Sequence, residues 1–268
     1  MRYRGEIAAV TAAAMLAAAP GAGAQDRPER INGRPNLNGI WQAANTAHWN
    51  LEAHSATALE DFWELGSLAA RPAGQSVVVE GTIPYKPEAL AKRDENRAGW
   101  PRTDPVAACY LPGIPRATYL PHPFQIVQGD GDILFAYAFA NANRAVHFED
   151  VRTLDQVPVD LWMGWSNGSW DGDTLVVTTI ANDDRTWLDA AGNYHSSAMT
   201  VTERFTLLTP NHIQYEATID DPNVFTQPWT VSMPLYRHVE PNAELLEFKC
   251  VEFSEHFLYN EFLKEPLE

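Results

Sequence analysis

The sequence predicts an all-β protein: an antiparallel barrel with short helices before it and one helix after it. From Phe124 onward, turn-forming residues recur at regular intervals between segments rich in β-branched and aromatic residues. These segments predict at least eight strands, and Asp171-Gly172 between two of them is a strong hairpin signal. Strands joined by short turns in this way form a meandering sheet, which we expect to close into a barrel.

The segments before this region predict one strand and two short helices. We expect the first strand in the segment LNGIWQ. Residues 57–70 predict a helix, because a Thr and a Glu at its start match a capping box and the apolar residues recur at helical spacing. A second helix is expected over residues 87–97, entered at a proline. The proline-rich stretch 100–123 then predicts an irregular loop.

The remaining elements follow in chain order. Two hairpins are expected, one from QIVQ and ILFAYAF and the other from WMGWSNGSW and TLVVTTI. Further strands are expected over residues 197–207, 212–219, 225–236 and 243–253, and a final helix over Ser254 to Lys264.

The first 24 residues resemble a cleavable signal peptide. Arg2 and Arg4 precede a short apolar run that ends in an Ala-x-Ala exit. That run is too short to span a bilayer, and an Ala-rich buried helix is the alternative. We therefore expect a periplasmic or secreted protein, with an extended lead-in over residues 25–36 and a single barrel domain over residues 37–268.

The charge of the chain narrows the range of partners. A net charge of −16 makes nucleic acid an unsuitable partner and disfavours an anionic membrane surface. No membrane anchor, nucleotide fingerprint or paired-histidine metal motif is recognisable, so we expect neither a cofactor nor a metal. The paired aspartates are typical of turns rather than of a calcium loop. The oligomeric state stays open.

The two cysteines, Cys109 and Cys250, predict a disulfide. An oxidising compartment lets such a bond persist, and closing a loop of this length stabilises a fold by about 5 kcal/mol in the chain-entropy model. The alternative is a pair of small buried thiols.

Two titratable side chains are the first candidates for chemistry. Successive side chains of a strand alternate between faces, so Glu203 shares the inward face of its strand with Phe205, and His195 lies at the mouth of that strand. Glu203 is then either a general acid or base or one half of an ion pair with Arg144. His195, oriented by Asp183, can transfer protons, or it is a surface residue that caps a loop.

Aromatic residues are the candidates for ligand contact. The chain holds nine tryptophans, and aromatic faces stack on flat apolar molecules and on sugar rings. Tyr215 is positioned to polarise a substrate oxygen. The expected binding walls, which also include Arg144, are formed by Trp187, Trp229, Tyr137 and Trp165. For each of them the alternative is packing in the barrel core.

Two resemblances extend this interpretation. The segment GWSNGSWDGDTLVV (Gly164 to Val177), with Arg144 before it and Glu203 and Arg204 after it, resembles secreted bacterial proteins of unassigned function. That resemblance covers about residues 105–255 and implies no reaction. The pattern has an Ile two residues after its Arg, where this chain has Val146. Gly39 and Trp41 near the first strand resemble the start of a lipocalin-like barrel, which implies an interior ligand pocket.

Together these observations lead to one functional hypothesis and two alternatives. The hypothesis is a barrel that binds a small apolar or aromatic molecule and performs cofactor-free acid/base chemistry, as an isomerase, dehydratase or cyclase. The alternatives are a non-catalytic carrier of a hydrophobic ligand and a carbohydrate-binding protein or lyase. The first two require aromatic side chains that enclose a cavity, whereas the third requires them along an open cleft.

Overall fold

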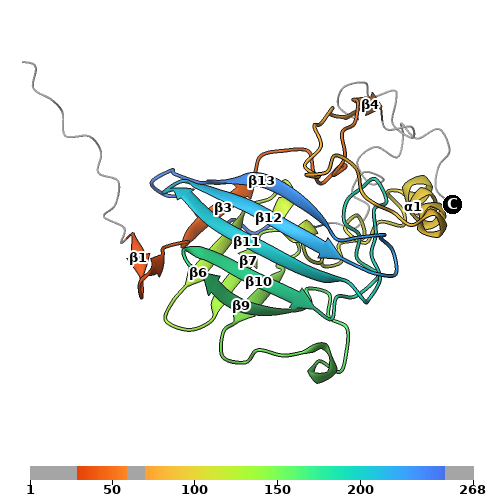
Figure 1. Ribbon diagram of the computed structural model, residues 1–268. Helices are drawn as coiled ribbons and strands as arrows, with labels where there is room; N and C mark the ends of the chain where they lie inside the picture. The colour runs from red at the N-terminus through yellow and green to blue at the C-terminus, as the bar shows by residue number, and fades with distance from the viewer. Residues whose placement is uncertain (1–28, 59–69, 251–268) are drawn as a thin grey trace, which may run out of the picture.

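A computed structural model describes residues 29–58 and 70–250 of the chain. Within them, nine strands form a closed barrel in the order β10-β11-β12-β13-β3-β6-β7-β8-β9 (Figure 1). Its strands are β3 (Gly39–Ala43), β6 (Phe124–Gln128), β7 (Ile133–Tyr137), β8 (Asn143–His147), β9 (Trp165–Asp171), β10 (Thr174–Ile180), β11 (Thr200–Thr209), β12 (His212–Asp220) and β13 (Trp229–Arg237). The expected barrel is therefore confirmed.

The barrel is mixed rather than antiparallel, which corrects the expectation from the sequence. Eight neighbouring pairs are antiparallel, but β8 and β9 run parallel, with Val146 opposite Ser166 and His147 opposite Asn167. The reason is geometric. A closed ring with an odd number of strands cannot alternate direction throughout, so at least one neighbouring pair must be parallel. Here the long connection between β8 and β9, which contains the 3₁₀ turn η2 (Leu154–Gln156), makes that pairing possible.

The barrel is closed by its first strand in the sequence. β3 pairs with β13 on one side, where Ala43 lies opposite Leu235, and with β6 on the other, where Trp41 lies opposite Phe124. The segment LNGIWQ therefore forms the strand expected of it, and this strand joins the last strand of the barrel, β13, to β6.

Short elements lie outside the barrel at its two ends. The pair β1 (Arg30–Ile31) and β2 (Arg34–Pro35) lies at one end, and α1 (Pro87–Gly99) and β4 (Thr57–Ala58) lie at the other (Figure 1). β4 pairs with β5 (Ala70–Arg71), and α2 (Arg116–Tyr119) follows the proline-rich loop. No helix among the described residues is long and apolar enough to cross a membrane.

Several predicted elements differ from the structure or lie outside it. The helix expected over 87–97 is confirmed as α1. The ends of the helix expected over 57–70 are instead the paired strands β4 and β5, and its middle, residues 59–69, lies outside the described residues. The segments for which a signal peptide and a C-terminal helix were predicted also lie outside the described residues. The prediction of a strand over residues 243–253 is wrong for residues 243–250, which contain only an isolated bridge from Phe248 to Phe139. Residues 251–253 lie outside the described residues.

The interior of the barrel is filled by side chains. Because side chains alternate along each strand, β11, β12 and β13 each direct every second residue inward. On β12, for example, Tyr215, Ala217 and Ile219 are all fully buried. Aromatic rings occupy much of the space, and Phe135 packs on both Phe124 and Phe205. Glu203 and Phe205 on β11 are both fully buried, as the alternation predicts, and the inward side chains form a packed core.

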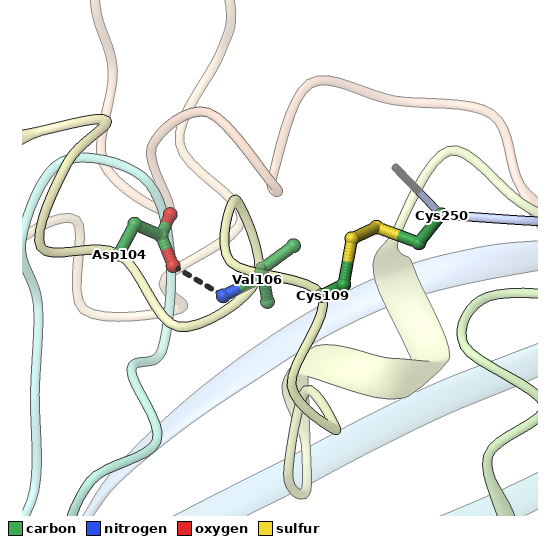
Figure 2. The surroundings of a disulfide bond; sticks show 4 residues. All are labelled: Asp104, Val106, Cys109 and Cys250. Carbon is green, nitrogen blue, oxygen red and sulfur yellow. Dashed lines mark hydrogen bonds between the residues drawn. A yellow bond between two sulfur atoms is a disulfide. The ribbon is translucent and has the colours of Figure 1, made fainter. Parts of the chain in front are cut away.

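The predicted disulfide between Cys109 and Cys250 is confirmed, with the two Cα atoms 5.6 Å apart (Figure 2). It joins the loop after α1 to the segment after β13, 141 residues later. Asp104 accepts a hydrogen bond from the backbone N–H of Val106 in the same loop (Figure 2). The disulfide therefore ties this loop to the segment after β13, and the hydrogen bond of Asp104 shapes a turn within the loop.

Removal of this bond should destabilise the protein strongly. We expect the double variant Cys109→Ser, Cys250→Ser to lose about 2–5 kcal/mol of unfolding free energy, because the unfolded chain regains the freedom of a long loop. Chemical denaturation of the two proteins, followed by circular dichroism, measures the difference. A loss below about 1 kcal/mol would contradict a structural role for the bond.

Candidate functional site

The centre of the barrel contains a buried ion pair between Arg144 on β8 and Glu203 on β11. The two guanidinium NH groups lie 2.5 and 3.1 Å from the two carboxylate oxygens of Glu203. The Glu203 side chain is 0 % exposed and that of Arg144 is 2 % exposed. Burial of two charges is tolerated only when they are paired and hydrogen-bonded in this way.

Neighbouring polar groups complete the surroundings of the ion pair. Tyr215 donates a hydrogen bond of 2.8 Å to one carboxylate oxygen of Glu203, and the guanidinium of Arg144 lies over the ring of Phe135 at 4.7 Å. Burial and the nearby carboxylate hold the pKa of Tyr215 well above its usual value. The hydroxyl of Tyr137 is also buried, and burial raises its pKa. Three of the predicted site residues, Glu203, Tyr215 and Arg144, therefore meet, but they meet inside the packed core.

The geometry therefore matches the second of the two alternatives for Glu203, in which it forms an ion pair with Arg144. Both of its oxygens accept hydrogen bonds from Arg144, and one also accepts from Tyr215. None of these residues lines either of the two surface clefts described below.

The stability of the variant Glu203→Gln tests whether Glu203 supports the fold more than an exposed charged residue does. We expect Glu203→Gln to lower the unfolding free energy by about 3–5 kcal/mol, because the buried charge of Arg144 then has no counterion. The adjacent residue Arg204 is the matched control. It forms an exposed pair with Asp171, their side chains being 39 and 70 % exposed, and Arg204→Gln should cost below about 1 kcal/mol. Equal losses in urea unfolding would contradict the assignment.

The structure places His195 in a buried loop before β11, not on the strand and not on the surface. The imidazole is 2 % exposed. Its Nδ1 lies 2.9 Å from the carbonyl oxygen of Ser196, and its Nε2 lies 2.7 Å from the hydroxyl of Thr186. Burial lowers its pKa. The carboxylate of Asp183 pairs with Arg185 instead, so the contact that orients His195 comes from Thr186.

The predicted tryptophans occupy three different environments. Trp229 is fully buried in the core beside Phe225. Trp165 is half-buried and stacks on His147, with the guanidinium of Arg152 3.8 Å from its ring centroid. Of the predicted aromatic residues, Trp187 alone lines one of the two clefts.

That cleft lies beside α1 and has a volume of about 520 Å³; we name it the rim cleft. Its aromatic lining is Tyr110, Trp162, Trp187 and Tyr194, and its polar lining includes Lys92, Glu95, Asn96, Arg102, Thr103, Asp104, Asp184 and Arg185. The lining comes from α1, the proline-rich loop, the loop before β9 and the loop after β10. These segments are far apart in the sequence, so no local pattern could have predicted that they meet.

Two rings form a fixed platform in the rim cleft. Tyr110 and Trp162 stack with their planes 6° apart and their centroids separated by 5.1 Å, and the guanidinium of Arg185 lies 4.4 Å from the Trp162 centroid. Tyr110 is 54 % exposed. It directly follows Cys109, which has a φ of 61°, an uncommon value for a residue with a side chain. The disulfide and this backbone conformation fix the direction in which Tyr110 leaves the loop.

α1 is held against the barrel by a close backbone approach. Asn96 on α1 donates a hydrogen bond to the carbonyl of Gly192. A Cβ at Gly192 would lie 2.6 Å from backbone atoms of Arg93 and Arg97, and the φ of this glycine is 87°. Only glycine therefore allows α1 to pack here. Asn96 lines the rim cleft, whereas its neighbour Arg97 lines a second cleft together with Ala191.

Buried ionisable groups stabilise the loops below α1. Arg116 and Asp104 form a two-point ion pair with both contacts at 2.7 Å. Asp189 is fully buried and accepts hydrogen bonds from the backbone N–H groups of Leu51 and Ala191. Burial raises the pKa of Asp189. For His48, burial, followed by the charge of Arg116, lowers the pKa to about 4.

His48 should make the stability of the protein sensitive to acid. Its pKa is about 4 when folded and about 6.5 when unfolded. The unfolded chain therefore binds the extra proton first, and stability falls as the pH drops from about 6.5 to about 4, by on the order of 3 kcal/mol.

The variant His48→Gln should show a smaller loss over this range, because glutamine does not titrate. Urea unfolding of both proteins at several pH values tests this, and the carboxylates that titrate in both proteins cancel in the difference. Parallel pH profiles would contradict the prediction.

Within residues 29–58 and 70–250, no group of three or more His, Cys, Asp or Glu side chains is placed to hold a metal ion. Comparisons of the chain with family models, with curated proteins and with solved structures find no match.

Proposed function

We propose that this protein binds carbohydrate, with a neutral sugar ring held in the rim cleft. The observation that carries the proposal is the stacked pair Tyr110 and Trp162, more than half of Tyr110 being exposed beside polar side chains of both charges. The volume of the cleft, about 520 Å³, lies within the usual range for small-molecule sites.

The composition of the lining favours a sugar over an apolar molecule. A sugar ring presents a face of C–H groups to an aromatic ring and hydroxyls around its edge. Asn96, Asp184 and Arg185 together offer hydrogen-bond donors and acceptors at that edge. A purely apolar ligand would cover these groups without replacing their hydrogen bonds to water, which costs about 1–3 kcal/mol for each buried group.

The charges of the lining favour a neutral ligand. Lys92 pairs with Glu95 at 3.2 Å, and Asp104 is paired with Arg116. Basic and acidic side chains are thus mixed in the rim cleft, so no single sign of charge selects an ion.

The same geometry weakens the support for acid/base chemistry on an apolar substrate in the barrel. That proposal requires Glu203 and His195 to face a shared cavity. Glu203 is instead engaged by Arg144 and Tyr215, and His195 by Thr186 and Ser196. The lipocalin-like expectation of an interior pocket loses support for the same reason, because Phe124, Phe135 and Phe205 fill that interior.

The proposal includes an extracytoplasmic location, periplasmic or secreted. The disulfide between Cys109 and Cys250 supports it, because such bonds persist mainly in oxidising compartments. Polysaccharides of the cell envelope and of the surroundings would be accessible to a sugar-binding protein there.

Titration with neutral oligosaccharides tests the proposal. We expect a panel of cello-, chito- and malto-oligosaccharides to include one that changes tryptophan fluorescence saturably. Tyr110→Ala should weaken its binding by about tenfold, which corresponds to about 1.4 kcal/mol of lost stacking.

The matched control is Tyr236→Ala, which removes an exposed tyrosine of β13 that lies outside the rim cleft. It should leave the affinity unchanged. Saturable binding of flat apolar compounds instead of sugars, with no effect of Tyr110→Ala, would refute the proposal.

A further inference from the structure

We propose that the redox state of the disulfide between Cys109 and Cys250 controls the sugar affinity of the rim cleft. This inference rests on the proposed function, because it concerns the regulation of the same site. Its basis is the position of Tyr110, which directly follows Cys109 and is the exposed half of the aromatic platform that it forms with Trp162. The oxidised protein is the form that binds sugar tightly.

The Trp162 half of the platform is anchored by contacts that do not involve a cysteine. Leu161, the residue before it, donates a backbone hydrogen bond of 2.8 Å to the carbonyl of Ala181. The carbonyl of Leu161 accepts a second one, 3.0 Å long, from the N–H of Asp183. These bonds tie Trp162 to the loop after β10, so this ring keeps its place when the disulfide is reduced.

The Tyr110 half is held in a different way. The N–H of Tyr110 donates a hydrogen bond of 2.9 Å to the carbonyl of Pro105, which belongs to the same loop. The disulfide is the covalent tie between this end of the loop and the segment after β13 (Figure 2). Reduction therefore releases the end of the loop that carries Tyr110.

The other end of this loop is held independently of the disulfide. Asp104 forms two contacts of 2.7 Å with the guanidinium of Arg116, and both side chains are buried. This ion pair is the same in both redox states. The effect of reduction is thus concentrated on the few residues that connect Asp104 to Tyr110.

The backbone of Cys109 gives the release a direction. Its φ of 61° lies in the left-handed region, which residues with a side chain rarely adopt. Once the sulfur is free, Cys109 can return to a negative φ, and the residue that follows it then leaves the loop at a different angle. The stacking of Tyr110 on Trp162, with ring centroids 5.1 Å apart, requires the angle found here.

The reductant that this switch requires is a dithiol. Both cysteines are partly exposed, so a thiolate can reach the bond. The thiolate attacks one sulfur and forms a mixed disulfide, which its second thiol then resolves. The protein gains two electrons and two protons and ends with two cysteine thiols, while the dithiol is oxidised to a disulfide.

Titration of the oxidised and the reduced protein with the cello-, chito- and malto-oligosaccharides tests the inference. We expect reduction with dithiothreitol to weaken binding by about fivefold, because ordering Tyr110 then opposes binding. By linkage, saturating sugar should make the disulfide harder to reduce by the same factor, a shift of about 20 mV to more negative potential. The variant Cys109→Ser, Cys250→Ser should bind weakly with or without dithiothreitol, which controls for effects of the reagent.

Two further variants separate this switch from a general loss of stability. Inserting one glycine between Cys109 and Tyr110 keeps the disulfide and removes the fixed direction of the ring, so the oxidised variant should also bind about fivefold more weakly. In Tyr110→Ala, reduction should change the affinity less than about twofold, because the ring through which it acts is missing. The insertion decides the test even where circular dichroism shows that the reduced protein unfolds.

The outcomes distinguish this inference from the proposed function. If no oligosaccharide binds the oxidised protein saturably, both are overturned. If sugar binds with the same affinity to the oxidised protein, the reduced protein and the glycine-insertion variant, the inference is overturned and the proposed function stands. An equal effect of reduction on Tyr110→Ala and on the unmodified chain would also overturn it.

Discussion

The ion pair between Arg144 and Glu203 determines how the rest of this barrel is organised. A charge in the interior is stable only beside its counterion, so β8 and β11 must present these two side chains to the same point across the barrel. The aromatic residues around the pair exclude water from it and occupy the remaining volume. A barrel filled in this way contributes stability, and the sugar site that we propose lies in the loops at its end.

The end of the barrel that carries α1 is built to be rigid although it consists of loops. A two-point ion pair fixes Arg116 to Asp104, the disulfide fixes Cys109, and Gly192 lets α1 approach the backbone beneath it. Loops held by several independent contacts keep side chains such as Tyr110 in one orientation. Less ordering entropy is then lost when a ligand binds.

Much of the barrel was predictable because alternation is a local property of the sequence. It placed Glu203 and Tyr215 on inward faces, and Arg144 was identified as a possible counterion. The parallel pair was not predictable, since the number of strands that meet in the closed sheet depends on β3, which pairs with strands distant in the sequence. The rim cleft was missed for the same reason, and Trp187 was the only predicted aromatic residue to line it.

The position of β3 also governs when the barrel can form. β3 begins at Gly39, but its partner on one side, β13, extends from Trp229 to Arg237. A ribosome must therefore synthesise nearly two hundred further residues before these two strands can pair. During that interval the edge of β3 that pairs with β13 stays unpaired, and such an edge associates readily with other chains. The growing polypeptide consequently depends on being kept apart from its neighbours until the last barrel strand has emerged.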